Sequence, residues 1–158
     1  MMAAQGNEIM TRIMFLCHGN ICRSPMAEFV MKELVRREGL EGSFEIASCA
    51  VSTEEIGNGI YPPAKSELRR RGIPFEEHTA VQLKRSDGER YDLFIVMDHS
   101  NLRRARDILG SGEKLHKLME FAGSGGDVTD PWYSRRFDTA FDDIMQGCKG
   151  LLEQLKNE

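Results

Sequence analysis

The chain has 158 residues, 41% of them hydrophobic and 29% charged, and a formal net charge of -4. This length and composition are typical of one globular domain with a buried core, and they exclude a disordered or fibrous chain. The negative charge argues against nucleic-acid binding, no apolar run approaches the ~18 residues that a membrane span requires, and no secretory signal is expected. Four cysteines are too few for a disulfide scaffold, so we expect a protein of the reducing cytoplasm.

The N-terminal part of the chain is predicted to hold a strand, a helix and a second strand. Residues 1–10 are expected to form a flexible tail, and residues 11–158 a single domain. Pro25 suits the first turn of the helix because its missing N–H would be unpaired there, and Gly39 is expected to end it. The predicted elements are a buried strand over 12–16, this helix, a short strand over 44–47 and a polar loop over 48–59.

The rest of the chain continues the alternation of helices and strands. Residues 93–97 are all apolar, as expected of a central parallel strand that is covered on both faces. The predicted elements are a helix from 62 to about 72, the strand 93–97, a helix capped by Asp98 and ending before Gly110, a strand over 114–118, a glycine-rich loop over 122–128 and a final helix over 137–155. This alternation predicts a parallel sheet with helices on both faces, and a ligand site at the carboxyl ends of its strands.

The loop between the first strand and the first helix carries the predicted chemistry. It reads Cys17-His18-Gly19-Asn20-Ile21-Cys22-Arg23-Ser24. A cysteine attacks as a thiolate, which a helix N-terminus, backbone N–H groups and an adjacent cation all stabilise. Gly19 permits close backbone approach and Asn20 tolerates a left-handed conformation, so the N–H groups from His18 to Cys22 can form an anion nest. Arg23 offers a planar fork for two phosphate oxygens.

These features predict a phosphoryl-transfer enzyme in which Cys17 attacks phosphorus and no metal or other cofactor is required. Ser24 is placed to donate its hydroxyl to the sulfur and so stabilise the thiolate as a leaving group. Asp130 is the best candidate for the acid that protonates the leaving group of the substrate, and for the base that later activates water. Trp132 and Tyr133 follow it closely and are expected to form an aromatic wall for a substrate ring.

Three segments of the chain resemble the low-molecular-weight protein tyrosine phosphatases. Residues 16–25 are similar to the phosphate loop of that family, residues 130–133 to its general-acid loop, and residues 97–102 to a stretch after its central strand. The resemblance extends from about residue 11 to residue 155. It implies an α/β fold of one domain, with a four-stranded parallel sheet flanked by helices on both faces and the phosphate-binding loop after the first strand.

The resemblance also implies an activity and a set of partners. The activity is hydrolysis of phosphotyrosine on proteins, and of small aryl phosphates, through a phosphocysteine intermediate. The partners are a phosphotyrosine-containing protein and a phosphate or sulfate anion in the loop, with no nucleic acid and no membrane, and the protein is expected to be a monomer. The implied catalytic residues are those argued above: Cys17, Arg23, Ser24 and Asp130.

Other positions take their roles from the resemblance alone. Asn20, Ser48 and His78 are expected to form the hydrogen-bond network that holds the loop ready for phosphate. Glu54 stands about where many relatives carry an aromatic residue on the rim of the pocket, and Trp132 replaces the usual tyrosine. We hypothesise that the acidic rim disfavours strongly acidic phosphopeptides.

The remaining cysteines have simpler interpretations. Cys22 either packs as a small apolar side chain or, as the resemblance implies, traps oxidised Cys17 as a disulfide. Cys49 and Cys148 are expected to be packing residues.

Three other functions are alternatives to phosphate-ester hydrolysis. A thioredoxin-coupled arsenate reductase uses a similar loop but needs further cysteines around residues 80–95, where this chain has none. A zinc-binding or redox-sensing module would use Cys17, Cys22 and His18, although structural zinc normally takes four ligands and no second Cys/His pair is present. A non-catalytic phosphate-binding protein would hold the anion in the same loop without turnover.

Overall fold

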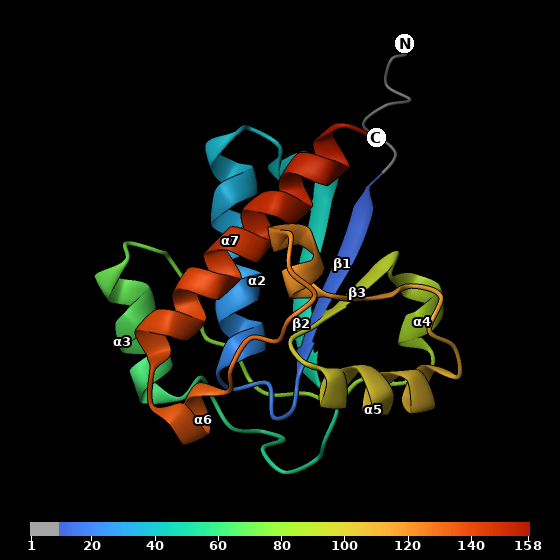
Figure 1. Ribbon diagram of the computed structural model, residues 1–158, viewed down its shortest axis with the longest axis horizontal. Helices are drawn as coiled ribbons and strands as arrows, with labels where there is room; N and C mark the ends of the chain where they lie inside the picture. The colour runs from blue at the N-terminus through green and yellow to red at the C-terminus, as the bar shows by residue number, and fades with distance from the viewer. Residues whose placement is uncertain (1–9) are drawn as a thin grey trace.

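The computed structural model describes residues 10–158, in which four parallel strands form one sheet with the order β2-β1-β3-β4 (Figure 1). The strands are β1 (Thr11–Cys17), β2 (Phe44–Ala50), β3 (Leu93–Val96) and β4 (Leu115–Lys117). The predicted fold class is therefore confirmed. The tail expected at residues 1–10 lies, apart from Met10, outside the described residues. Because the strand order reverses beside β1, the carboxyl end of β1 is the place where such a sheet binds ligands.

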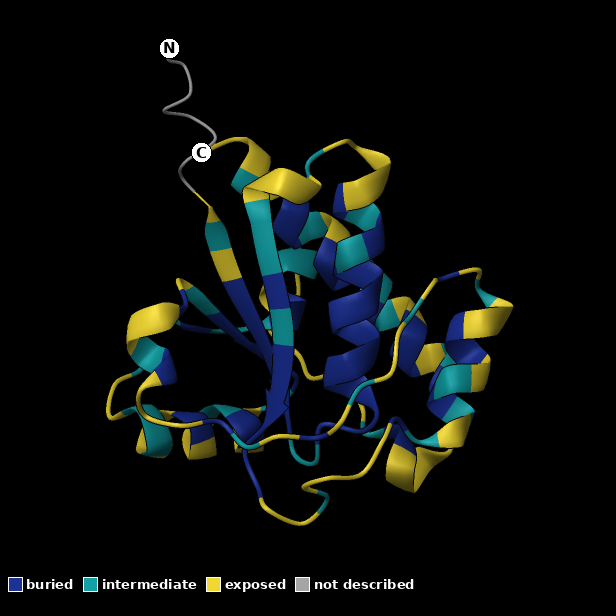
Figure 2. Ribbon diagram, turned by 180° about the vertical axis from the view of Figure 1, so that it is seen from behind, coloured by how far each residue is buried: buried dark blue, intermediate teal, exposed yellow. Residues whose placement is uncertain are grey.

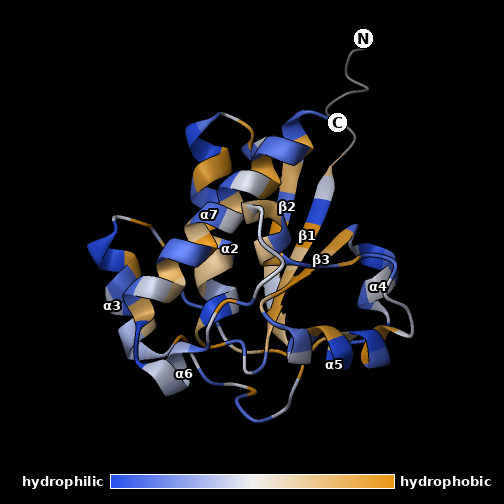
Figure 3. Cartoon of the chain, viewed as in Figure 1, coloured by the Kyte–Doolittle hydropathy of each residue, from blue (hydrophilic) through white to orange (hydrophobic). Residues whose placement is uncertain are grey.

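Helices cover both faces of this sheet and form two separate hydrophobic clusters with it. On one face lie α2 (Arg23–Arg37), α3 (Pro62–Arg70) and α7 (Phe137–Lys156), and on the other lie α4 (Asp87–Arg90) and α5 (His99–Leu109). Strand β1 contributes to both, because Phe15 packs in the first cluster and Leu16 in the second. Alternate side chains of a strand point to opposite faces, so the part of β1 that is covered on both sides, residues 13–16, is buried and apolar (Figures 2 and 3).

The structure differs from the predicted elements at the end of β2 and in four short helical segments. A loop was predicted from residue 48, but strand β2 continues to Ala50. Residues 48–50 pair with the last three residues of β1 and so remain in the sheet. Two helices of a single turn, α4 and α6 (Pro131–Ser134), were not predicted, nor were the 3-10 helices η1 (Glu41–Ser43) and η2 (Leu118–Ala122). Segments this short hold too few residues to show a helical period.

The segment after β4 packs unusually closely on the last helix. A Cβ at Gly150 of α7 would collide with the carbonyl group of Phe121 in η2, and one at Gly147 would collide with the side chain of Leu118. Both positions therefore require glycine for the two backbones to approach. None of the helices within residues 10–158 has the length and apolar character needed to cross a membrane.

Candidate active site

The candidate site lies in the loop that joins β1 to α2. Cys17 is the last residue of β1 and Arg23 the first of α2, so the loop between them opens at the carboxyl edge of the sheet. Asn20 has φ of 62°, a left-handed conformation that L-residues other than Asn and Asp rarely adopt. This turn brings the backbone of the loop around the sulfur of Cys17.

Three hydrogen-bond donors surround that sulfur. The Sγ atom of Cys17 lies 3.0 Å from the hydroxyl of Ser24, and it accepts from the backbone N–H groups of Asn20 and Ser24 at 3.3 and 3.4 Å. Only 3% of Cys17 is exposed, yet it lines the pocket that the loop encloses. The sulfur is thus held at the base of a pocket and directed into it.

Asn20 is the centre of a buried hydrogen-bond network behind the loop. Its amide nitrogen donates to Ser24 Oγ at 2.8 Å and to Ser48 Oγ at 3.0 Å. Its amide oxygen accepts from the backbone N–H of Val81 at 3.3 Å and lies 2.9 Å from Nε2 of His78. All four hydrogen-bonding positions of the side chain are used, which fixes the loop in one conformation.

The network assigns a direction to the bond between Ser24 and Cys17. Because Ser24 Oγ already accepts a hydrogen from Asn20, its own hydrogen is free to point to the sulfur. In the same way Ser48 accepts from Asn20 and donates to the buried carboxylate of Glu28 at 2.6 Å. Burial is the largest influence on His78 and lowers its pKa, although the nearby charge of Glu28 opposes the shift.

Arg23 is held almost entirely out of solvent, with 2% of its side chain exposed. Its Nη1 donates to Asp98 at 2.8 Å and to the carbonyl oxygen of Val128 at 2.7 Å. Burial would lower the pKa of this guanidinium, but the charges of Cys17, Asp130 and Asp98 outweigh it and raise the pKa. Arg23 is therefore a fixed cation, and its Nη1 already has an acceptor for each of its two hydrogens.

Asp130 caps the single turn of α6 beside this guanidinium. One carboxylate oxygen accepts from the backbone N–H of Trp132 at 3.1 Å, and the other lies 3.4 Å from Nη2 of Arg23. The side chain is 27% exposed, so it reaches both the pocket and solvent.

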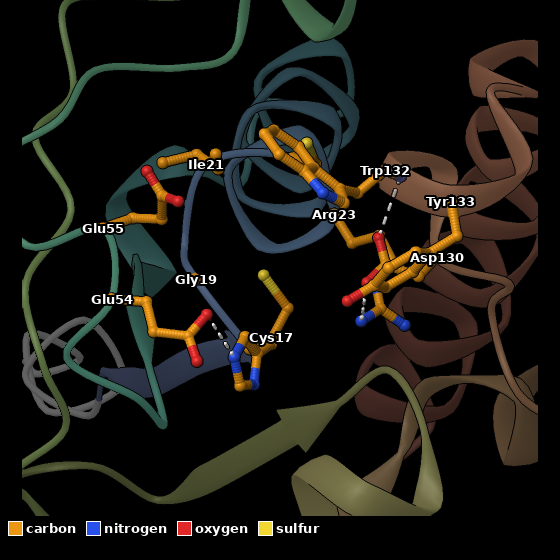
Figure 4. A pocket seen from close by; sticks show the side chains of 11 residues that line it. Cys17, Gly19, Ile21, Arg23, Glu54, Glu55, Asp130, Trp132 and Tyr133 are labelled. Atoms are coloured by element: carbon orange, nitrogen blue, oxygen red, sulfur yellow. Dashed lines mark hydrogen bonds and ion pairs between the residues drawn. The ribbon is translucent and has the colours of Figure 1, made fainter.

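Figure 4 shows the pocket, with the sulfur of Cys17 near its middle. Glu54 and Glu55 lie along one side, and Asp130 lies on the opposite side with the rings of Trp132 and Tyr133. The carboxylate of Glu54 is paired with Nε2 of His18 at 3.0 Å. The residues that line the pocket are Cys17, His18, Gly19, Ile21, Cys22, Arg23, Glu54, Glu55, Asp130, Trp132 and Tyr133.

The structure thus brings the predicted residues into two connected groups. The first group lines the pocket and comes from the loop between β1 and α2, from residues 130–133 and from Glu54. The second group lies behind the pocket in the hydrogen-bond network and consists of Asn20, Ser24, Ser48 and His78. Sequence reasoning missed Glu28, Asp98 and Glu55. Asp98 lies two residues beyond the end of β3. Its position after a central strand was a usable signal, because a parallel sheet binds its ligand at the carboxyl ends of its strands.

The four cysteines are all free thiols and all buried. Burial is the main cause that raises the pKa of Cys22, Cys49 and Cys148. Cys22 lines the pocket beside Cys17, whereas Cys49 and Cys148 pack in the two hydrophobic clusters. Within residues 10–158 no three His, Cys, Asp or Glu side chains gather in a way that could hold a metal ion.

Comparison with known proteins identifies the family. Residues 12–158 match the family model described as "Low molecular weight phosphotyrosine protein phosphatase", and the chain belongs to this family. It is 34% identical over 153 residues to the low molecular weight protein-tyrosine-phosphatase YfkJ of Bacillus subtilis, which covers 94% of this chain and 98% of the relative. It is 32% identical over 149 residues to the human low molecular weight phosphotyrosine protein phosphatase, with 90% of this chain and 94% of the relative covered.

Solved structures show the same likeness in three dimensions. The crystal structure of YfkJ superposes with a TM-score of 0.90 at 33% identity, over 94% of this chain and 96% of the other. The structure of SP-PTP from Streptococcus pyogenes gives a TM-score of 0.83 at 33% identity, over 92% and 93% of the two chains. A protein tyrosine phosphatase from Entamoeba histolytica, solved with Hepes in its active site, gives 0.87 at 25% identity over 93% and 97%.

Proposed function

We propose that this protein hydrolyses phosphotyrosine on proteins, and small aryl phosphates, with Cys17 as the nucleophile. The observation that carries the proposal is the meeting of three groups in one pocket: the sulfur of Cys17, the guanidinium of Arg23 and the carboxylate of Asp130. Each has a separate part in phosphoryl transfer. Membership of the phosphatase family supports the same activity.

The loop is suited to bind the phosphate group of the substrate. The backbone N–H groups of Asn20 and Ser24 point to the sulfur of Cys17 at the start of α2, where the helix dipole also favours an anion. Because Nη1 of Arg23 is occupied by Asp98 and Val128, the edge formed by Nε and Nη2 remains for two phosphate oxygens. These donors also match the equatorial oxygens, where charge lies in the transition state.

In the first step the thiolate of Cys17 attacks phosphorus, and the bond between phosphorus and the phenolic oxygen breaks. The departing oxygen takes a proton from Asp130, so tyrosine leaves as a neutral phenol and phosphate remains on the sulfur. Asp130 must therefore be protonated when substrate binds.

In the second step water attacks the phosphocysteine. Asp130, now a carboxylate, accepts a proton from the water, and the bond between sulfur and phosphorus breaks to release inorganic phosphate. The thiolate that leaves receives the hydrogen bond of Ser24, whose direction the Asn20 network sets. The cycle returns Cys17 and Asp130 to their starting forms, and it uses no metal and no cofactor.

The walls of the pocket indicate which substrates fit. Trp132 and Tyr133 are 42% and 82% exposed as whole residues, and their side chains lie beside Asp130, where the ring of a phosphotyrosine would lie. Glu54 and Glu55 place negative charge on the opposite side. We therefore propose that phosphopeptides with basic flanking residues bind better than acidic ones. We also propose that the protein acts as a monomer, because Cys17, Arg23 and Asp130 already meet within one chain.

The proposal is tested by following hydrolysis of para-nitrophenyl phosphate and of a tyrosine-phosphorylated peptide in the presence of EDTA. Wild type is expected to turn over both, and Cys17→Ser neither. Cys148→Ala removes another buried cysteine, outside the pocket, and is expected to keep the activity. Phosphate binding without turnover would identify a binding protein instead, and activity that needs metal or survives Cys17→Ser would overturn the mechanism.

A further inference from the structure

Arg135 adopts a backbone conformation that its residue type disfavours. It ends α6 with φ of 63°, in the left-handed region where glycine or asparagine is usual. Its N–H donates to the carbonyl of Pro131 at 2.9 Å, which closes the turn that carries Asp130 and Trp132. A residue other than glycine stays in this conformation when its surroundings hold it there, so the contacts of the Arg135 side chain are informative.

The contacts of Arg135 converge on Tyr61. Its Nη2 donates to the hydroxyl of Tyr61 at 3.2 Å, and its Nη1 donates to the carbonyl of Trp132 at 3.3 Å. The guanidinium also lies over the rings of Tyr61 and Phe137, at 5.5 and 5.6 Å from their centroids. The side chain therefore joins the acid loop to the residue that precedes α3.

Tyr61 contacts both halves of the site. Its ring packs on the ring of Trp132, with centroids 4.8 Å apart and planes tilted by 49°. Its backbone N–H donates to the carbonyl of Ile21 in the phosphate loop at 2.9 Å. One residue outside the pocket lining thus connects the loop that holds the phosphate with the turn that holds the acid.

We propose that Tyr61 and Arg135 form a clamp that positions Asp130 over the leaving group, so that both are positioning residues for the reaction. The inference rests on the proposed function, because it concerns the proton that Asp130 delivers. Without the clamp, the indole of Trp132 loses its support and the turn 130–135 is free to move away from the phosphate loop. Rate is then lost mainly for substrates whose leaving group needs that proton.

The test compares two substrates, phenyl phosphate, whose leaving group needs protonation, and 2,4-dinitrophenyl phosphate, whose leaving group does not. The quantity compared is kcat/KM, because it covers only the steps up to formation of the phosphocysteine and leaves out its hydrolysis, in which Asp130 is proposed to act as a base. In Tyr61→Ala we expect kcat/KM for phenyl phosphate to fall about tenfold and kcat/KM for the dinitrophenyl ester to change less than about twofold. Tyr61→Phe keeps the stacking and loses only the hydroxyl, so a smaller fall of about threefold is expected.

Arg135→Gly provides a variant that separates catalysis from folding. Glycine adopts the left-handed conformation without strain, so the thermal midpoint is expected to stay level or rise while kcat/KM for phenyl phosphate still falls. Arg136→Ala is the matched control, because Arg136 is the exposed neighbour and its side chain pairs with Asp138, outside the clamp. It is expected to keep the wild-type rates on both substrates.

A double-mutant cycle decides between positioning and a general structural effect. In the Asp130→Asn background, Tyr61→Ala is expected to lower kcat/KM for phenyl phosphate less than about twofold, because the proton donor is already absent. An equal loss on both substrates, or the same loss with and without Asp130, would overturn the clamp. Either result would leave the proposed function intact, since that depends on turnover by wild type and its absence in Cys17→Ser.

Discussion

Asp130 and Arg23 approach within 3.4 Å, between an oxygen of the carboxylate and Nη2 of the guanidinium. The acid loop is therefore already drawn over the phosphate loop. In the proposed mechanism phosphate binds between them, and the same oxygen then faces the group that departs from phosphorus. This geometry leads to an asymmetric prediction for loss of the acid.

Asp130→Asn is expected to slow phenyl phosphate by about 100-fold or more, the usual contribution of general acid catalysis. The same variant is expected to slow 2,4-dinitrophenyl phosphate far less in the first step, because that leaving group needs no proton. Burst kinetics separate formation of the phosphocysteine from its hydrolysis, in which we propose that Asp130 also acts. Equal losses on the two burst rates would remove Asp130 from the role of acid.

Arg23→Lys keeps the positive charge but loses the planar fork. A hydrogen bond to a charged group contributes about 1.5–3 kcal/mol, so kcat/KM is expected to fall by about ten- to a hundredfold. Inhibition by inorganic phosphate is expected to weaken in parallel. The control is Arg12→Lys, since Arg12 is exposed on β1 and pairs with Glu45. Wild-type kinetics in Arg23→Lys would show that charge alone is sufficient.

The acidic rim is expected to discriminate between phosphopeptides. Exposed charge pairs contribute about 0.2–1 kcal/mol each, so a peptide with lysines beside the phosphotyrosine should have a kcat/KM several-fold above that of one with glutamates. The double substitution Glu54→Gln and Glu55→Gln removes the acidic charges and should reduce this ratio toward one. Salt at about 0.5 M should have the same effect on the wild type, because it screens interactions between exposed charges. Glu153→Gln, an exposed position on α7, is the control. A ratio unchanged by the double substitution would contradict this role.

The stability of the network around Asn20 is expected to depend on pH through His78. Burial lowers the pKa of His78 in the folded state, whereas in the unfolded chain it returns to about 6.5. Below about pH 6.5 the unfolded chain binds more protons, so the free energy of unfolding falls as the pH drops from 7 to 5. In His78→Gln this contribution is absent and the slope should be smaller. Urea unfolding at pH 7, 6 and 5 measures both slopes, and identical slopes would contradict the assignment.

Chemical modification should distinguish Cys17 from the other cysteines. Burial raises the pKa of Cys22, Cys49 and Cys148, so these thiols stay neutral and react slowly. Iodoacetate is expected to add one carboxymethyl group, on Cys17, and inorganic phosphate should protect it. Peptide mass spectrometry locates the modified residue. Rapid modification of Cys22 in the folded protein would show that it is more accessible than its position indicates.

The sequence predicted the framework well because periodicity and composition encode it locally. The apolar run of β3, Pro25 at the start of α2 and the cysteine loop each carry their signal within a few neighbouring residues. The resemblance to the family added Ser48 and His78, which no local pattern indicated. Both lie beside Asn20 in the structure.

The parts that the sequence did not predict depend on contacts between distant segments. Glu28 reads as an ordinary helical acid until β2 places Ser48 against it, 20 residues further along. The packing of Tyr61 on Trp132 depends on how α3 and α6 meet, which no periodicity specifies. The helices α4 and α6 are a single turn each, so their existence is decided by caps and tertiary contacts.

The partners of Arg23 bear on how the protein acquires its activity. Asp98 lies 75 residues beyond Arg23 in the chain, and the carbonyl of Val128 lies 105 residues beyond it. The guanidinium cannot be neutralised and oriented until the C-terminal half has docked on the sheet. Nascent or truncated chains that end before this half would bury an uncompensated cation at the base of the pocket. Hydrolysis can therefore serve as a reporter of complete folding, and a chain cleaved before Val128 is expected to lose catalysis together with its native packing.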